Sequence, residues 1–122
     1  MNYLNAQVIG RLTKDAKVFA ANGDKKAMAG FTVAVSTGKD ADGKDRTTFV
    51  ECELRGDLVD RVGQYLIKGK EVMVTGTPAV RTFETANGKG ASLALYANFV
   101  QLGADPKGSG EGSPAKLEEA PL

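Results

Sequence analysis

The sequence predicts an all-β fold, a small closed barrel with one short helix, on three observations. Within residues 1–103 the hydrophobic period is mostly two, which is the period of strands that bury one face. Helical spacing occurs in one segment, which begins near Asp57 and ends near Gly69. Turn signals separate the alternating stretches, and Asn87-Gly88 is the strongest of them. We therefore expect about five strands, with the helix between the third and the fourth.

The first two expected strands lie in the N-terminal third of the chain. The first is Ala6–Leu12, and its Gly10 signals a bulge or a close approach of another backbone. The second covers residues 31–36, where Phe31 and two valines alternate with smaller side chains. Phe31 and the valines should therefore face the core.

The third expected strand covers residues 47–55 and has two contrasting sets of side chains. One set is apolar and should face the core: Val50, Cys52 and Leu54. The other set should face solvent or a ligand: Phe49, Glu51, Glu53 and Arg55. The polar linker before this strand, residues 36–47, contains an Asp-Gly and predicts a mobile hairpin loop.

The expected helix is followed at once by the fourth strand. Asp57 can cap its N-terminus, and Gly69 ends it. Its apolar face consists of Leu58, Val62, Tyr65 and Leu66. Asn87-Gly88 then joins the fourth strand to the fifth, in which Tyr96 and Phe99 have opposite parity, so one of the two should point inward. This order of elements matches a five-stranded Greek-key barrel of the OB type, whose open bottom the helix closes.

The segment from residue 104 onward differs from the rest in composition and charge. It is rich in Gly, Ser and Pro, so we expect residues 1–103 to form the folded domain and residues 104–122 a disordered tail. Its two lysines and four acidic residues carry a net charge of −2, which leaves +3 of the total +1 on residues 1–103. A basic body with an acidic end hints at a polyanionic partner.

Composition excludes several classes of protein. No apolar run approaches the roughly 20 residues of a membrane span, and the start of the chain does not read as a signal peptide, so we expect a cytoplasmic protein with no membrane partner. Cys52 is the single cysteine and histidine is absent. These two facts exclude an internal disulfide, an ordinary zinc set and a Cys–His or Ser–His dyad. We expect no enzyme, no metal and no cofactor.

Four stretches follow one another along the chain in an order that indicates a known family: "VIGRLTKDAKV", "FTVAVS", "TTFVECELRGDLVDRVGQYLIKGKEVMVTGTPAVRTFE" and "FVQLG". Together they cover most of residues 6–103 and resemble the bacterial and phage single-stranded DNA-binding protein (SSB) family. Each stretch alone is common, but the ordered set is specific. The resemblance implies sequence-independent binding and protection of single-stranded DNA in replication, recombination or repair. It also implies a homo-oligomer, with a tetramer favoured and a dimer as the alternative.

The resemblance also indicates site residues. Proteins that bind single strands combine stacking aromatics with cations that follow the phosphates. Phe49 and Phe83 stand where the family carries stacking aromatics. The favoured phosphate contacts are Arg55, Arg81, Lys39, Arg46 and Lys89, with Lys14 and Lys17 as second choices. The family's acidic tip, which docks on replication and repair proteins, is represented here by Glu118, Glu119, Pro121 and Leu122.

Three other functions stay open on the residues alone. A protein-binding barrel would use Phe49 and Phe83 against another polypeptide, since the fold does not settle function. An RNA-binding barrel would use the same stacking and phosphate contacts. An enzyme is the weakest alternative. The absence of Trp and the presence of Glu51 and Glu53 beside Phe49 predict weaker, more salt-sensitive binding than in Trp-rich relatives, and the short tail fits a phage or plasmid copy.

Overall fold

The strands form one closed sheet. A computed structural model describes residues 1–106 of the 122-residue chain. The elements are β1 (Ala6–Leu12), β2 (Lys17–Phe19), β3 (Met28–Lys39), β4 (Asp45–Arg55), α1 (Asp57–Val62), the 3-10 helix η1 (Gly63–Tyr65), β5 (Glu71–Thr85) and β6 (Gly88–Leu102). The strand order is β1-β5-β6-β4-β3-β2, and a β1–β3 pairing closes the barrel. The predicted five-stranded barrel of the OB type is confirmed, with the three-residue β2 added at the edge of β3.

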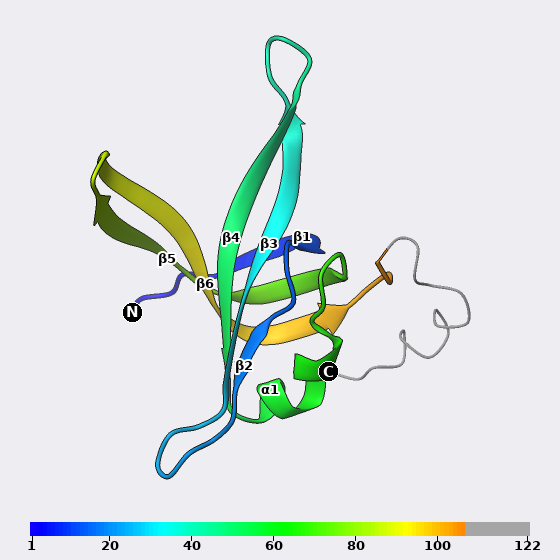
Figure 1. Ribbon diagram of the computed structural model, residues 1–122, viewed down its shortest axis with the longest axis vertical. Coiled ribbons are helices and arrows are strands. Elements are labelled where there is room, and N and C mark those ends of the chain that lie inside the picture. Colours follow the sequence, from blue (N-terminus) through cyan, green and yellow to red (C-terminus); the bar gives the residue numbers. More distant parts are fainter. Residues whose placement is uncertain (107–122) are drawn as a thin grey trace.

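Two hairpins extend beyond the barrel wall. In Figure 1 the β3–β4 hairpin points upward and the β5–β6 hairpin points to the left, while the connection between β2 and β3 loops out at the bottom. Helix α1 lies at the lower end of the barrel, as expected for the element that closes it. The two hairpins and the connection between β2 and β3 therefore project from the barrel in three different directions.

The core follows the alternation that the sequence predicts. Val50, Cys52 and Leu54 of β4 are buried, as is Phe31 of β3. The helical segment adds its own buried residues: Val59, Val62 and Leu66. Leu58 and Tyr65, which we placed on the same helical face, are partly buried and pack against this core. Burying such side chains contributes about 1.5–3 kcal/mol each, so the helix stabilises the barrel as a plug.

The close approach predicted at Gly10 is confirmed. Gly10 pairs with Val72 of β5, and the next residue, Arg11, pairs with both Glu71 of β5 and Ala34 of β3. At this position β1 therefore passes from β5 to β3. A Cβ on Gly10 would collide with the carbonyl oxygen of Ala34. Only glycine lets the backbones of β1 and β3 meet closely enough to close the barrel.

The helix boundaries differ from the prediction. Gly56, with a φ of 72°, is the N-cap, and Asp57 is the first helical residue and makes no side-chain capping hydrogen bond. Its carboxylate instead lies in the first turn, where a negative charge interacts favourably with the helix dipole. The α-helix ends at Val62 and continues as η1, and Gly69 lies in the turn that precedes β5. The prediction of Asp57 as the cap and of Gly69 as the helix end was therefore wrong.

The linker predicted as a mobile loop is shorter than expected. Strand β3 continues to Lys39 and β4 begins at Asp45, with a register shift between Ser36 and Lys39. In the remaining turn, Oδ1 of Asp40 accepts hydrogen bonds from the backbone amides of Asp42 and Lys44 at 2.9 and 3.0 Å. Polar residues at both ends of this linker thus belong to a long hairpin, because an exposed hairpin arm needs no apolar face.

The prediction that one of Tyr96 and Phe99 points inward was also wrong. The pairing of β5 with β6 shifts register between Thr75, which pairs with Phe99, and Gly76, which pairs with Ala97. One extra residue in β6 therefore changes which side chains face the core. Tyr96 and Phe99 are both exposed as a result.

Residues 103–106 continue the contacts of the barrel. Nζ of Lys70 donates a hydrogen bond to the carbonyl of Gly103 at 2.9 Å and lies 3.4 Å from a carboxylate oxygen of Asp105. The backbones of Glu71 and Gly103 and of Glu71 and Ala104 are also hydrogen-bonded. The described structure thus extends past the predicted boundary at residue 103. The predicted tail residues Glu118, Glu119, Pro121 and Leu122 lie outside the described residues.

Among residues 1–106 no helix is both long and apolar enough to cross a membrane. In the same range no three or more Cys, Asp or Glu side chains gather as a metal ion would require.

Candidate nucleic-acid interface

One side of the sheet carries an unusual collection of exposed aromatic and charged side chains. Strand pairing places them on the same side, because directly paired residues of neighbouring strands point the same way. We call this surface the outer face and define it by Phe19, Thr32, Phe49, Glu51, Glu53, Arg55, Arg81, Phe83 and Tyr96.

The two predicted stacking aromatics point outward, as expected. The exposed fraction is 56% for Phe49 and 48% for Phe83. Phe83 also has a structural contact, because its ring covers Gly90 on the paired strand β6, where a Cβ would collide with it. The absence of a side chain at Gly90 therefore leaves room for the Phe83 ring against β6. Whether bases stack on either ring stays a prediction.

Two further aromatics lie on the outer face and were missed by the sequence reasoning. Phe19 of β2 is 54% exposed and Tyr96 of β6 is 42% exposed. The Asn22-Gly23 pair, bridged to Lys25, was an available hairpin signal for the strand that carries Phe19. No local signal reveals Tyr96, since its orientation depends on the bulge in β6. The outer face thus has four exposed rings instead of two.

Arg81 reaches across the sheet from β5. Its guanidinium donates to Oε1 of Glu51 at 3.2 Å and to Oε1 of Glu53 at 3.4 Å, although β6 lies between these strands. It also donates to the hydroxyl of Tyr96 at 3.3 Å and lies 5.3 Å from the centre of that ring. The hydrogen bond with Tyr96 is the largest cause of a raised pKa of Arg81.

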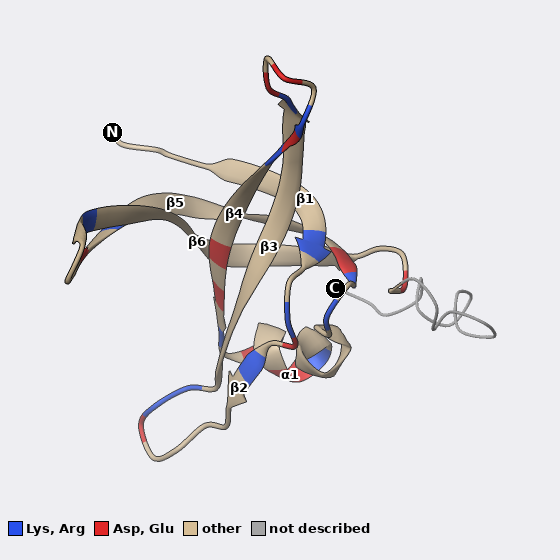
Figure 2. Cartoon of the chain, turned by 45° about the horizontal axis from the view of Figure 1, so that its top comes forward, with Lys and Arg blue, Asp and Glu red and all other residues tan. Residues whose placement is uncertain are grey.

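Arg55 completes this arrangement on β4. It donates from Nε to Oε2 of Glu53 at 2.8 Å and forms an ion pair with the same oxygen at 2.7 Å. We call Glu51, Glu53, Arg55 and Arg81 the central ion cluster. Its two carboxylates and two guanidinium groups neutralise one another, so Glu51 and Glu53 do not present a bare negative patch to a phosphate. Figure 2 shows acidic residues midway along β4, with basic residues on the surrounding segments.

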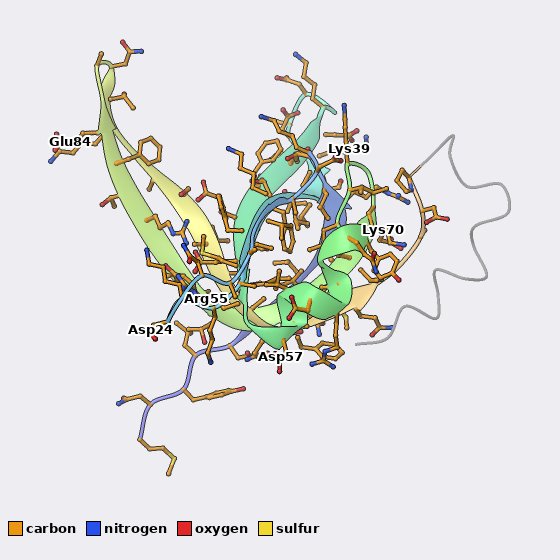
Figure 3. All side chains as sticks on the ribbon, turned by 60° about the horizontal axis from the view of Figure 1, so that its bottom comes forward. Asp24, Lys39, Arg55, Asp57, Lys70 and Glu84 are labelled. Atoms are coloured by element: carbon orange, nitrogen blue, oxygen red, sulfur yellow. The ribbon has the colours of Figure 1, made fainter. Side chains whose placement is uncertain are left out.

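The remaining predicted cations lie away from this cluster. Lys39 pairs with Asp45 at 2.7 Å on the β3–β4 hairpin, where Arg46 donates to the carbonyl of Lys39 at 3.0 Å. Lys89 is exposed on the β5–β6 hairpin. Figure 3 shows Lys39, Arg55 and Glu84 well separated from one another, with Glu84 on the hairpin at the left and Arg55 in the body of the molecule. The structure therefore distributes the predicted phosphate contacts over the centre of the outer face and the two hairpins.

Two grooves follow the outer face. The first has a volume of about 600 Å³ and is lined in part by Lys14, Lys17, Phe19, Thr32, Glu51, Glu53 and Arg81. The second, of about 980 Å³, is lined in part by Phe19, Lys25, Lys26, Met28 and Arg55. Phe19 borders both. The two second-choice lysines thus line a groove, and Lys25 and Lys26 join them as cations that the sequence reasoning missed.

Comparison with known proteins identifies the family. The sequence model of the single-strand binding protein family matches residues 4–102. The chain belongs to this family. The resemblance inferred from four stretches of sequence is thereby confirmed. Because this is a family of binding proteins, membership also supports a binding protein over an enzyme.

Individual curated relatives agree with this family assignment. The chain is 35% identical over 81 residues to a single-stranded DNA-binding protein of Clostridium perfringens, covering 66% of this chain and 52% of the relative. It is 32% identical over 116 residues to one of Treponema pallidum, covering 92% and 62%. This chain spans about half the length of the first of these relatives.

A solved structure agrees with the fold. The structure of a small single-stranded DNA-binding protein from Streptomyces coelicolor superimposes with a TM-score of 0.69 at 20% identity. The superposition covers 86% of this chain and 96% of the other.

Proposed function

We propose that this protein binds single-stranded DNA independently of its sequence, across the outer face. The observation that carries the proposal is the presence of four exposed aromatic rings on one side of an OB-type barrel, beside grooves lined by lysines. Aromatic rings accept any base because every base has a π-face. The names of the relatives from Clostridium perfringens and Treponema pallidum support DNA as the ligand.

In this proposal the aromatic residues of the outer face contact bases, and the cations contact phosphates. Phe49 stacks on bases on β4, and Phe83 does so near the tip of the β5–β6 hairpin. Tyr96 adds stacking surface in the centre, beside Glu53, and Phe19 adds it on the edge strand β2. The phosphates contact cations at the border of the outer face: Lys14, Lys17, Lys25, Lys26, Lys39, Arg46 and Lys89. Arg55 and Arg81 act in the centre, where a guanidinium both stacks on a base and meets a phosphate.

Binding of this kind fits a role in protecting exposed single strands during replication, recombination or repair. We propose that the protein works as a homo-oligomer, with a tetramer favoured over a dimer. Ile9 and Phe99 support self-association, because both are large, apolar and exposed on β1 and β6 outside the outer face. Docking of replication or repair proteins on Glu118, Glu119, Pro121 and Leu122, and residence in the cytoplasm, belong to the same proposal.

Light scattering with and without an oligo-dT strand tests binding and assembly together. We expect one mass for the protein alone, larger than that of a monomer, and a defined larger mass when the strand is added at low salt. An oligo-rU of the same length, run in parallel, measures the preference for DNA. A protein that leaves oligo-dT unbound at low salt would contradict the proposed function and favour a protein-binding barrel.

A further inference from the structure

The carboxylates in the middle of the outer face need an explanation, because a surface for a polyanion gains nothing from negative charge. Glu51 and Glu53 are separated by one residue on β4, and both line the first groove. Their side chains differ in exposure, at 44% for Glu51 and 16% for Glu53. The two residues therefore present different amounts of carboxylate to a bound strand.

Their hydrogen bonds differ in the same direction. Glu53 has both oxygens engaged, since Arg55 bonds to Oε2 and Arg81 bonds to Oε1. Glu51 receives Arg81 on Oε1, and within residues 1–106 its Oε2 accepts no hydrogen bond. Arg81 thus fixes the orientation of the Glu51 carboxylate and leaves one of its oxygens available in the groove.

The charge distribution decides which part of a nucleotide meets that oxygen. Lys14 and Lys17, which line the same groove, attract phosphate, whereas the Glu51 carboxylate, whose charge Arg81 neutralises, does not. The backbone of a bound strand should follow the lysines, with its bases directed toward the middle of β4. The exposed oxygen of Glu51 then faces the hydrogen-bonding edge of a base.

Bases differ in what they offer to a carboxylate. The exocyclic amino group of cytosine donates a hydrogen bond to Glu or Asp, whereas thymine carries a carbonyl oxygen at the same position. The ring N–H of thymine or uracil lies between two carbonyl oxygens, and both of these repel a carboxylate. An acceptor held in place by Arg81 therefore favours cytosine.

We propose that Glu51 is a base-reading residue that gives this surface a preference for cytosine over thymine and uracil. The inference rests on the proposed function and deepens it. Stacking and phosphate contacts supply affinity that is independent of sequence, and Glu51 superimposes a modest selectivity for bases that carry an amino group. Glu53 has no such role, because its oxygens are already occupied.

Deoxycytidine and deoxyuridine oligonucleotides of equal length provide the test, since neither base has the thymine methyl group and they differ only at one edge. Fluorescence anisotropy at neutral pH gives the ratio of the Kd for oligo-dU to the Kd for oligo-dC. We expect Glu51→Gln to lower this ratio by about threefold, because the neutral amide oxygen is a weaker acceptor for the cytosine amino group and the amide N–H can donate to the carbonyl oxygen of uracil. Asp60→Asn, which removes an equal charge from the exposed surface of α1, should leave the ratio unchanged.

The outcomes separate the inference from the proposed function. An unchanged ratio in Glu51→Gln, with both strands still bound, overturns the base-reading role alone. An equal gain in affinity for both strands also overturns it, because Glu51 would then act only through its charge. Failure of the unmodified protein to bind either strand overturns both proposals. Glu51→Ala, which removes the acceptor altogether, should reproduce the lowered ratio, and thermal unfolding shows whether each variant is folded.

Discussion

Two groups of opposite charges in this protein have the same chemistry and different surroundings. Lys70 and Asp105 lie 3.4 Å apart, and their side chains are 1% and 10% exposed. The central ion cluster on the outer face has comparable distances, from 2.7 to 3.4 Å, but its side chains are more open to water. The buried pair therefore contributes to the stability of the fold, and the exposed cluster sets the charge at the surface of the outer face.

Water explains why similar pairs act so differently. A buried charge that loses its partner cannot be solvated, so breaking a buried pair is strongly destabilising. Asp105 is especially dependent on Lys70, because within residues 1–106 its buried Oδ2 has no hydrogen-bond partner. An exposed pair is screened by solvent, and its loss changes stability little.

Removal of Lys70 tests this comparison with the largest expected effect. Lys70→Met leaves the Asp105 carboxylate buried without its cation, so we expect the free energy of unfolding to fall by about 3–5 kcal/mol. Arg81→Met on the exposed cluster should cost less than about 1 kcal/mol. Chemical denaturation at one fixed protein concentration measures both. Equal losses in the two variants would remove the distinction, and the double variant Lys70→Met/Asp105→Leu should regain most of the stability.

The exposed aromatic rings of the outer face should affect binding and not stability. Phe49→Ala and Phe83→Ala should each weaken binding to oligo-dT by about 1–3 kcal/mol, the contribution of one stacked base, with little change in stability. Val80→Ala is a matched control, because Val80 is 71% exposed and points away from the outer face on the same strand as Phe83. If Val80→Ala weakened binding as much as Phe83→Ala, stacking on the outer face would be the wrong explanation.

Cys52 extends the comparison to a neutral group, since it lies between Glu51 and Glu53 but faces the core. Burial raises the pKa of its thiol from 9.0 to about 12. Between these values the unfolded chain loses the proton while the folded chain keeps it, so stability falls as the pH rises. The stability advantage of the unmodified protein over Cys52→Ala should shrink by about 1.4 kcal/mol between pH 8 and pH 10. Denaturation curves at both values check this, and an advantage independent of pH would contradict it.

The smallest expected effect concerns the cations at the border of the outer face. Lys17 has no ion pair among residues 1–106, whereas Lys39 is paired with Asp45. Lys17→Ala should reduce the slope of log K against log salt by about 0.7, the value for one phosphate contact on a single strand. Lys39→Ala should reduce it less, because Asp45 already neutralises part of its charge. Titrations at several salt concentrations measure both slopes, and a larger change for Lys39 would reverse this ranking.

Much of the fold and half of the aromatic surface could be predicted from local patterns. The alternation in β4 separates Val50 and Cys52, which are buried, from Phe49, which is exposed. The prediction for Tyr96 failed because a bulge in β6 is created by pairing with β5 and leaves no mark in the sequence. Phe19 was missed for a different reason, since its strand has three residues and is too short for a period to appear.

The sequence by itself determined the strand alternation, the single helix and the outward direction of Phe49 and Phe83. Each of these is a property of neighbouring residues, because a strand places successive side chains on opposite sides. The tertiary structure alone decided which charges meet: Arg81 with Glu51 and Glu53, and Lys70 with Asp105. Those partners are 28 to 35 residues apart in the sequence, and only strand order and register bring them within reach of one another.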